Sequence, residues 1–281
     1  GASLNCKDLY ADYVKSNSFE KTMIRCLQSL IPYLKRDDEI DIQKIMNWEE
    51  VKEIIVPELV CTRRAGENLE DLIYRNVEGT DLAIIYRVKQ QVANIVGSIK
   101  VSKQMMETWG VDENRIHEFA FHNMNQLSTL QIVELNSDFA MPEETFSELP
   151  EKMNKYSSYV FTNKEAFYGA ATIMEEGMLH SIAERLQEGF YLLPMDVDNI
   201  VVYPEGMMKN LESIHSMVLI HNIQCLEPEN YLSDQVYYYS KEKGELSMST
   251  NPENTQDVII KILQQAMECS PGKKEDYGEE R

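Results

Sequence analysis

The segment Phe190–Pro204, FYLLPMDVDNIVVYP, constrains the fold of this chain more than any other stretch. Two short runs rich in apolar, β-branched and aromatic residues, Tyr191–Leu193 and Ile200–Tyr203, flank the polar connection Met195–Asn199. Runs of this length bounded by Pro, Asp and Asn are typical of β-strands. The segment therefore predicts a hairpin that is buried on at least one face.

The remaining elements are predicted from similar patterns. Apolar residues at helical spacing predict helices within 8–35, over 41–61 with a kink or an end near Pro57, over 103–109 between a Ser102 cap and Gly110, and over 112–130, 170–186, 211–226 and 253–268. Runs of β-prone residues predict strands at 81–88, 97–101, 159–162, 236–240 and 245–249. The acidic residues 136–155 include two prolines and predict a loop with a short helix at most.

The predicted strands come in hairpins and do not alternate singly with helices. This order favours an α+β fold over a doubly wound parallel sheet. We expect a mainly antiparallel sheet with helices packed on one face and a helical N-terminal region. The expected units are a helical region over 1–80, a hairpin with helices over 81–155, an α+β core over 156–268 and a disordered tail over 269–281, or else 81–268 as one domain.

The charge balance excludes some classes of partner. The chain has 27 basic and 47 acidic residues, a formal net charge of -20. Nucleic-acid binding needs a positive footprint, and so does binding to an anionic membrane surface. No apolar run approaches the roughly 18 residues of a membrane span. The expected partners are therefore another protein or a second copy of this chain.

The cysteines indicate a reducing compartment. The five cysteines are odd in number and no two have C-x-x-C spacing, which argues against disulfides and against a zinc knuckle. No signal peptide is recognisable, so we expect a cytoplasmic protein. Because the chain begins at Gly1 without Met, we also expect that its natural N-terminus is missing.

A series of short segments carries a resemblance to a known family. They are WEEVK (48–52), PEL (57–59), DLAIIY (81–86), TWGV (108–111), YVFTN (159–163), GAA (169–171), YLLP (191–194) and LSDQVY (232–237). In this order and spacing, from about Asp8 to Thr250, the chain resembles the uncharacterised domain-of-unknown-function family 5688 of gut clostridial proteins. The resemblance implies an intracellular bacterial protein without an established activity, and a further family segment before Gly1.

One position departs from the family pattern. After the Leu-Pro the family tends to read Ser-Ser-hydrophobic-His-Glu, whereas this chain reads Met-Asp-Val-Asp-Asn over 195–199. If the His-Glu pair performs chemistry in relatives, this chain has lost it or has replaced it with Asp198 and Asn199.

Asp196 and Asp198 are the sharpest polar pair in the sequence. Two carboxylates two residues apart could hold Mg²⁺ or Ca²⁺ through oxygen. The alternative is that they cap backbone groups of a turn, as Asp and Asn commonly do. The missing EF-hand spacing favours the second interpretation. A metal-dependent hydrolase would need Asp81 or His180 to complete the metal shell.

Four tyrosines are candidate binding residues: Tyr191, Tyr203, Tyr237 and Tyr239. They flank two expected surfaces, the hairpin around 237–239 and a groove beside Phe190–Pro204. A stacking platform for single-stranded nucleic acid would also need a basic groove, which the charge balance disfavours.

Sequence motifs for catalysis are missing. The chain has no G-x-S-x-G elbow, no Walker A loop and no G-x-G-x-x-G, and no two histidines have H-E-x-x-H spacing. We therefore expect no cofactor. The preferred function is a non-catalytic protein- or ligand-interaction module, and the alternative is the metal-dependent hydrolase with Asp196 and Asp198.

Overall fold

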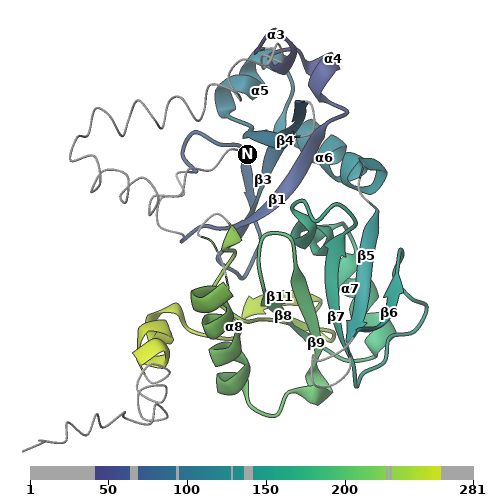
Figure 1. The fold of residues 1–281 in the computed structure, drawn as a ribbon, viewed down its shortest axis with the longest axis vertical. Coiled ribbons are helices and arrows are strands. Elements are labelled where there is room, and N and C mark those ends of the chain that lie inside the picture. The colour runs from purple at the N-terminus through teal and green to yellow at the C-terminus, as the bar shows by residue number, and fades with distance from the viewer. Residues whose placement is uncertain are drawn as a thin grey trace, which may run out of the picture.

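The computed structural model describes residues 42–63, 69–92, 95–127, 129–135, 142–225, 227 and 230–260. Two antiparallel sheets lie toward opposite ends of the long axis (Figure 1). This arrangement confirms the predicted α+β class. The helix expected within 8–35 and the tail 269–281 lie outside the described residues.

The smaller sheet is organised around one long strand. Its strands are β1 (Ile55–Cys61), β2 (Tyr74–Asn76), β3 (Leu82–Val92) and β4 (Ile95–Lys100). β3 pairs with β1 along one side and with β2 and then β4 along the other. The pairing of β3 with β4 confirms the hairpin predicted from 81–88 and 97–101.

The helix predicted over residues 41–61 is wrong for most of its length. Two single-turn helices, α3 (Ile42–Ile45) and α4 (Trp48–Val51), precede strand β1. A run of apolar residues fits a buried helix or a buried strand equally well, and the pairing with β3 decides for the strand. Pro57 is tolerated because β1 is an edge strand, where one ladder hydrogen bond is not needed.

Two helices cover the smaller sheet. α5 (Lys103–Trp109) begins after Ser102, whose Oγ accepts a hydrogen bond from the backbone N–H of Met105 at 3.2 Å, and ends at Gly110 with φ 67°. Both helix ends confirm the prediction. α6 (Glu113–Leu127) is tied to the start of β1, because Asn123 Nδ2 donates to the carbonyls of Lys52 and Ile55 at 2.7 and 2.8 Å.

The larger sheet has the strand order β11-β10-β8-β9-β7-β5-β6. Its strands are β5 (Leu130–Leu135), β6 (Pro142–Phe146), β7 (Ser158–Asn163), β8 (Phe190–Pro194), β9 (Ile200–Pro204), β10 (Tyr237–Ser240) and β11 (Glu245–Met248). The strands predicted at 159–162, 236–240 and 245–249 and the hairpin of Phe190–Pro204 are confirmed.

The helix predicted over 112–130 is confirmed as α6, and β5 follows it without having been predicted. Two further predictions need correction. β6 lies in the expected loop 136–155. β6 is acidic and begins with a proline, features that an edge strand tolerates. The helix predicted over 170–186 is broken into a 3₁₀ segment (Gly169–Met174) and α7 (Met178–Leu186), because Gly177 between them has φ 74°.

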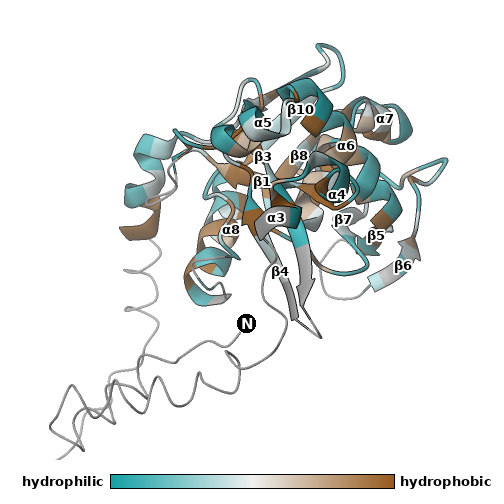
Figure 2. Ribbon diagram, turned by 90° about the horizontal axis from the view of Figure 1, so that it is seen from above, coloured by the Kyte–Doolittle hydropathy of each residue, from teal (hydrophilic) through white to brown (hydrophobic). Residues whose placement is uncertain are grey.

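Helices cover both faces of the larger sheet, not one face as predicted. Successive residues of a strand point to opposite faces. Leu192 and Val202 belong to the core that includes α7, whereas Leu193 and Val201 pack with Val218 of α8 (Leu211–Cys225). In Figure 2 the hydrophobic residues lie along the strands and on α8, and the connecting loops are mainly hydrophilic.

One apolar core extends through both sheets. It includes Leu59 and Tyr86 of the smaller sheet and Phe161, Phe190 and Tyr237 of the larger one, all essentially buried. After β11 the chain turns through a 3₁₀ segment (Pro252–Asn254) into a helix whose described part ends at residue 260. The division into units over 1–80, 81–155 and 156–268 stays a prediction.

Candidate functional site

The carboxylate pair Asp196 and Asp198 lies in the tight connection between β8 and β9. Asp196 Oδ1 accepts hydrogen bonds from the backbone N–H of Asp198 and from Asn199 Nδ2, both at 2.8 Å. Asp198 Oδ1 accepts a hydrogen bond from the backbone N–H of Tyr168 at 2.6 Å. These contacts are those of side chains that cap backbone groups.

The turn packs closely against the segment that follows β7. Tyr168 has φ 56°, and a Cβ added to Gly169 would lie 2.5 Å from the Asp198 carbonyl oxygen. Burial, together with the nearby carboxylates of Asp196 and Glu58, raises the pKa of Asp198 to about 6, against the opposing effect of the hydrogen bond from Tyr168. The carboxyl of Asp198 is therefore held in a tight and partly desolvated position.

No metal-binding group forms around this pair in the described part of the chain, where no three His, Cys, Asp or Glu side chains gather as a cation would require. Asp81 instead contacts Cys61, Arg63 and Tyr237, and His180 is exposed on α7. A metal site at Asp196 and Asp198 stays a prediction.

The four candidate tyrosines occupy different environments. Tyr237 and Tyr239 point to the same face of β10 and are buried, with Tyr239 stacked on Phe190 at a centroid distance of 5.2 Å. Tyr191 is half-buried, and its ring centre lies 5.0 Å from that of Tyr238. The paired strands β8 and β10 therefore present Tyr191 and Tyr238 on one face of the sheet, while Tyr237 and Tyr239 belong to the interior.

Tyr203 lines the groove that was expected beside β9. The groove encloses about 530 Å³, and its lining also includes Tyr156, Met207, Lys209 and Ile214. Lys209 is the one charged side chain in this lining, and Tyr156 is 67% exposed. The groove is therefore roomy, and its polar groups, which also include Asn210 and Ser213, contain no carboxylate.

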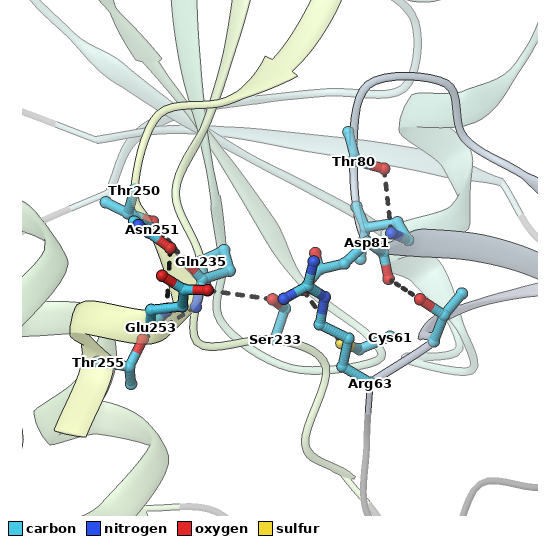
Figure 3. Close-up of polar contacts among 12 residues, drawn as sticks. Cys61, Arg63, Thr80, Asp81, Ser233, Gln235, Thr250, Asn251, Glu253 and Thr255 are labelled. Carbon is cyan, nitrogen blue, oxygen red and sulfur yellow. Dashed lines mark hydrogen bonds and ion pairs between the residues drawn. The ribbon is translucent and has the colours of Figure 1, made fainter.

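A denser set of polar groups lies where the two sheets meet (Figure 3). Tyr237 of β10 donates a hydrogen bond from its hydroxyl to Asp81 Oδ1 at 2.6 Å, across 156 residues of sequence. A carboxylate can only accept, so the second hydrogen bond of this hydroxyl, at 2.7 Å, comes from Ser233. Asp81 Oδ2 accepts a hydrogen bond from the Cys61 thiol at 3.5 Å and lies 4.0 Å from Arg63 Nε.

Local hydrogen bonds fix Asp81 on the side of the smaller sheet. Asp81 directly precedes β3, and its backbone carbonyl accepts from the Thr62 backbone N–H at 2.8 Å, just beyond the end of β1. Thr80 Oγ1 accepts from the Leu82 backbone N–H at 3.0 Å. The ends of two neighbouring strands therefore hold Asp81 and Cys61 side by side.

The other side of the cluster is anchored through Gln235. Its Oε1 accepts from Thr250 Oγ1 at 2.8 Å, and its Nε2 donates to Thr255 Oγ1 at 3.1 Å. Asp234 is held from α8, because Asn222 Nδ2 donates to Asp234 Oδ1 at 2.8 Å. Ser233, Asp234 and Gln235 are thus positioned by three different parts of the fold.

These groups line a cavity of about 280 Å³, which we name the Asp81 cavity. Its lining consists of Cys61, Arg63, Asp81, Tyr231, Ser233, Asp234, Gln235, Pro252, Thr255, Gln256 and Ile259. A concave site with a few convergent polar groups and perturbed titratable residues is the usual form of a small-molecule site. The Asp81 cavity has this form, and unlike the groove beside Tyr203 its lining includes carboxylates.

The thiol and the two phenols around the Asp81 cavity remain protonated at neutral pH. Burial, and next the negative charge of Asp81, raise the pKa of the Cys61 thiol to about 11. Burial and the carboxylate of Asp234 raise the pKa of Tyr231, and burial and Asp81 raise that of Tyr237. A protonated thiol is a poor nucleophile, and the lining contains no histidine to act as its base.

The sequence indicated this site only indirectly. The sequence offers Asp81 only as a possible metal ligand, and nothing adjacent in sequence marks Asp81 or Cys61 as part of a cluster. A signal did exist, since two of the segments that carry the family resemblance, 81–86 and 232–237, meet at this cluster.

The comparison with protein families agrees with the resemblance. A model of a family of unknown function, DUF5688, matches residues 1–241. The chain belongs to this family. A search of curated proteins and a search of solved structures each found no match.

The expectations about membrane spans and about the cysteines can be compared with the described residues only. In this part of the chain no helix combines the length and the apolar character needed to cross a membrane. Cys61 is a free, buried thiol, and Cys6, Cys26 and Cys269 lie outside the described residues.

Proposed function

We propose that this DUF5688 chain is a cytoplasmic, non-catalytic binding module that holds a small polar molecule in the Asp81 cavity. The observation that carries the proposal is the convergence of Asp81, Arg63 and Asp234 with several neutral polar groups around one concave space. Asp81 is the buried one of these three charged residues. Charged side chains are rarely buried in a folded domain unless they have partners or a functional role.

The chemistry of the lining favours binding over catalysis. Catalysis by Cys61 would need a thiolate, and the thiol pKa is raised, not lowered. General acid–base catalysis at neutral pH works best with a group whose pKa lies near 7, and the phenols of Tyr231 and Tyr237 are shifted away from that range. The carboxylates and hydroxyl oxygens of the lining are instead suited to accept hydrogen bonds from a ligand.

A thermal-shift screen tests the proposal, because a ligand that binds only the folded state raises Tm. The probes are small primary amines, amino acids, carboxylates and phosphates, tested on the parent chain and two variants. Gln256→Trp adds bulk to an exposed residue of the cavity lining. Asn254→Trp makes the same addition to an exposed residue of the same segment that lines a different hollow, with Leu211 and His215.

The expected result is that at least one class raises Tm of the parent and of Asn254→Trp but not of Gln256→Trp. If no class raises Tm of the parent, the proposal is refuted. It is also refuted if every compound class that raises Tm of the parent raises Tm of Gln256→Trp by the same amount, because the binding site then lies elsewhere.

A further inference from the structure

The charges around the Asp81 cavity define the class of molecule that it would hold. Its lining contains two carboxylates, Asp81 and Asp234, and one guanidinium, Arg63, so its formal charge is 1 − 2 = −1. Asp81 is 5% exposed, whereas the Arg63 side chain is 56% exposed. The cavity therefore has a negative inner end and a positive group nearer to solvent.

Among the described residues, no strong positive partner contacts the inner end. Asp81 accepts hydrogen bonds from a thiol and a phenol, and its distance of 4.0 Å from the exposed Arg63 is that of a weak ion pair. A buried carboxylate is stabilised much more by a charged donor in direct contact. Ser233 and Tyr231 add hydroxyl oxygens that can accept hydrogen bonds from the same donor.

The volume of the Asp81 cavity and the negative charge of its lining together restrict which ligands it can hold. A volume of 280 Å³ is the liquid share of about nine water molecules. This space admits a molecule of the size of an amino acid. The negative charges of Asp81 and Asp234, which add to the effect of burial in raising the pKa of Cys61 and Tyr231, also disfavour phosphates and other anions.

We propose that the Asp81 cavity binds a small zwitterion with a primary ammonium and a carboxylate, the chemistry of a free amino acid. The ammonium lies beside Asp81 and Asp234, where an NH₃⁺ group can donate three hydrogen bonds. The carboxylate faces Arg63, whose guanidinium can hold it through two parallel hydrogen bonds. This inference rests on the proposed function and adds the ligand class to it.

Calorimetric titration with three related compounds tests the ligand class. L-alanine carries both charges, N-acetyl-L-alanine lacks the ammonium, and L-alaninamide lacks the carboxylate. We expect L-alanine to bind and the affinity for N-acetyl-L-alanine to be lower by a factor of about ten or more. L-alaninamide should show an intermediate affinity.

The variant Arg63→Gln identifies the group that meets the carboxylate. It should lower the affinity for L-alanine to about that for L-alaninamide and leave the affinity for L-alaninamide unchanged. Arg63 is exposed, so the fold should tolerate the change, and an unchanged Tm of the free variant checks this. Equal losses for both compounds would contradict the assigned orientation.

The outcomes separate the two proposals. The zwitterion proposal is overturned if N-acetyl-L-alanine binds as tightly as L-alanine. It is also overturned if L-alanine does not bind while a carboxylate or a phosphate does, and Gln256→Trp abolishes that binding. Both outcomes leave the proposed binding module standing. If neither these three compounds nor the members of the four-class screen bind, both proposals fall.

Discussion

Replacing Tyr237 with phenylalanine would remove one buried hydroxyl from the junction between the two sheets. Tyr237 is fully buried, and its hydroxyl donates to the Asp81 carboxylate at 2.6 Å and accepts from Ser233 at 2.7 Å. A hydrogen bond to a charged group contributes about 1.5–3 kcal/mol, and a neutral one contributes about 0.5–1.5 kcal/mol. We therefore expect Tyr237→Phe to lower the free energy of unfolding by about 2–4 kcal/mol.

The same strand offers a matched control. Tyr239 lies two residues further along β10, is 4% exposed, and stacks on Phe190, but its hydroxyl makes no hydrogen bond within the described residues. Tyr239→Phe removes the same atom from a position nearer to solvent, so its effect should stay within about 0.5 kcal/mol.

Urea unfolding of the parent and both variants, followed by circular dichroism, measures these differences, provided that the slope with urea is unchanged. A loss for Tyr237→Phe that is no larger than the loss for Tyr239→Phe would refute the reasoning. It would mean that the contact between Tyr237 and Asp81 does not stabilise the junction.

Three further substitutions give distinct expected outcomes. The pKa of Asp198, about 6, lies above its ordinary value of 3.8, so the folded state binds this proton more tightly and loses stability as pH rises from about 4 to 6. At pH 7.5 the free energy of unfolding of Asp198→Asn, measured with urea, should therefore exceed that of the parent by about 1 kcal/mol after discounting for solvent exposure. At pH 4 the two free energies should be equal. Gly169→Ala places a Cβ 2.5 Å from a backbone oxygen and should cost about 1–3 kcal/mol in urea unfolding; parent-like stability would contradict this close packing. Asn123→Leu leaves two buried carbonyls without a donor, so calorimetric Tm should fall by an amount equivalent to about 2–4 kcal/mol, and an unchanged Tm would show that water replaces the amide.

The fold was predictable wherever one local signal settled an element. The hairpin Phe190–Pro204 is bounded by turn residues on both sides, and α5 has a capping residue at each end, so both were predicted correctly. Elements were mispredicted where an apolar run fits two structures. The segment that forms β1 has helix-compatible spacing, and only its pairing with β3 makes it a strand.

The candidate site was less predictable, for a physical reason. The Asp81 cavity is built from residues near positions 61, 81, 233 and 255, and their proximity depends on how two sheets pack. No spacing rule within one segment reports such packing. The turn with Asp196 and Asp198, by contrast, is local, and the capping that was weighed against a metal site is the contact pattern that the structure shows.

The most direct test of the account is to locate a bound ligand by amide chemical shifts. ¹H–¹⁵N spectra of the chain would be recorded with and without the four-class panel of amines, amino acids, carboxylates and phosphates. The account predicts shifts concentrated at residues 61–63, 231–235 and 255–259, which surround the Asp81 cavity. Shifts concentrated instead at Tyr203 and residues 206–214, around the larger groove, or no shifts with any class, would contradict it.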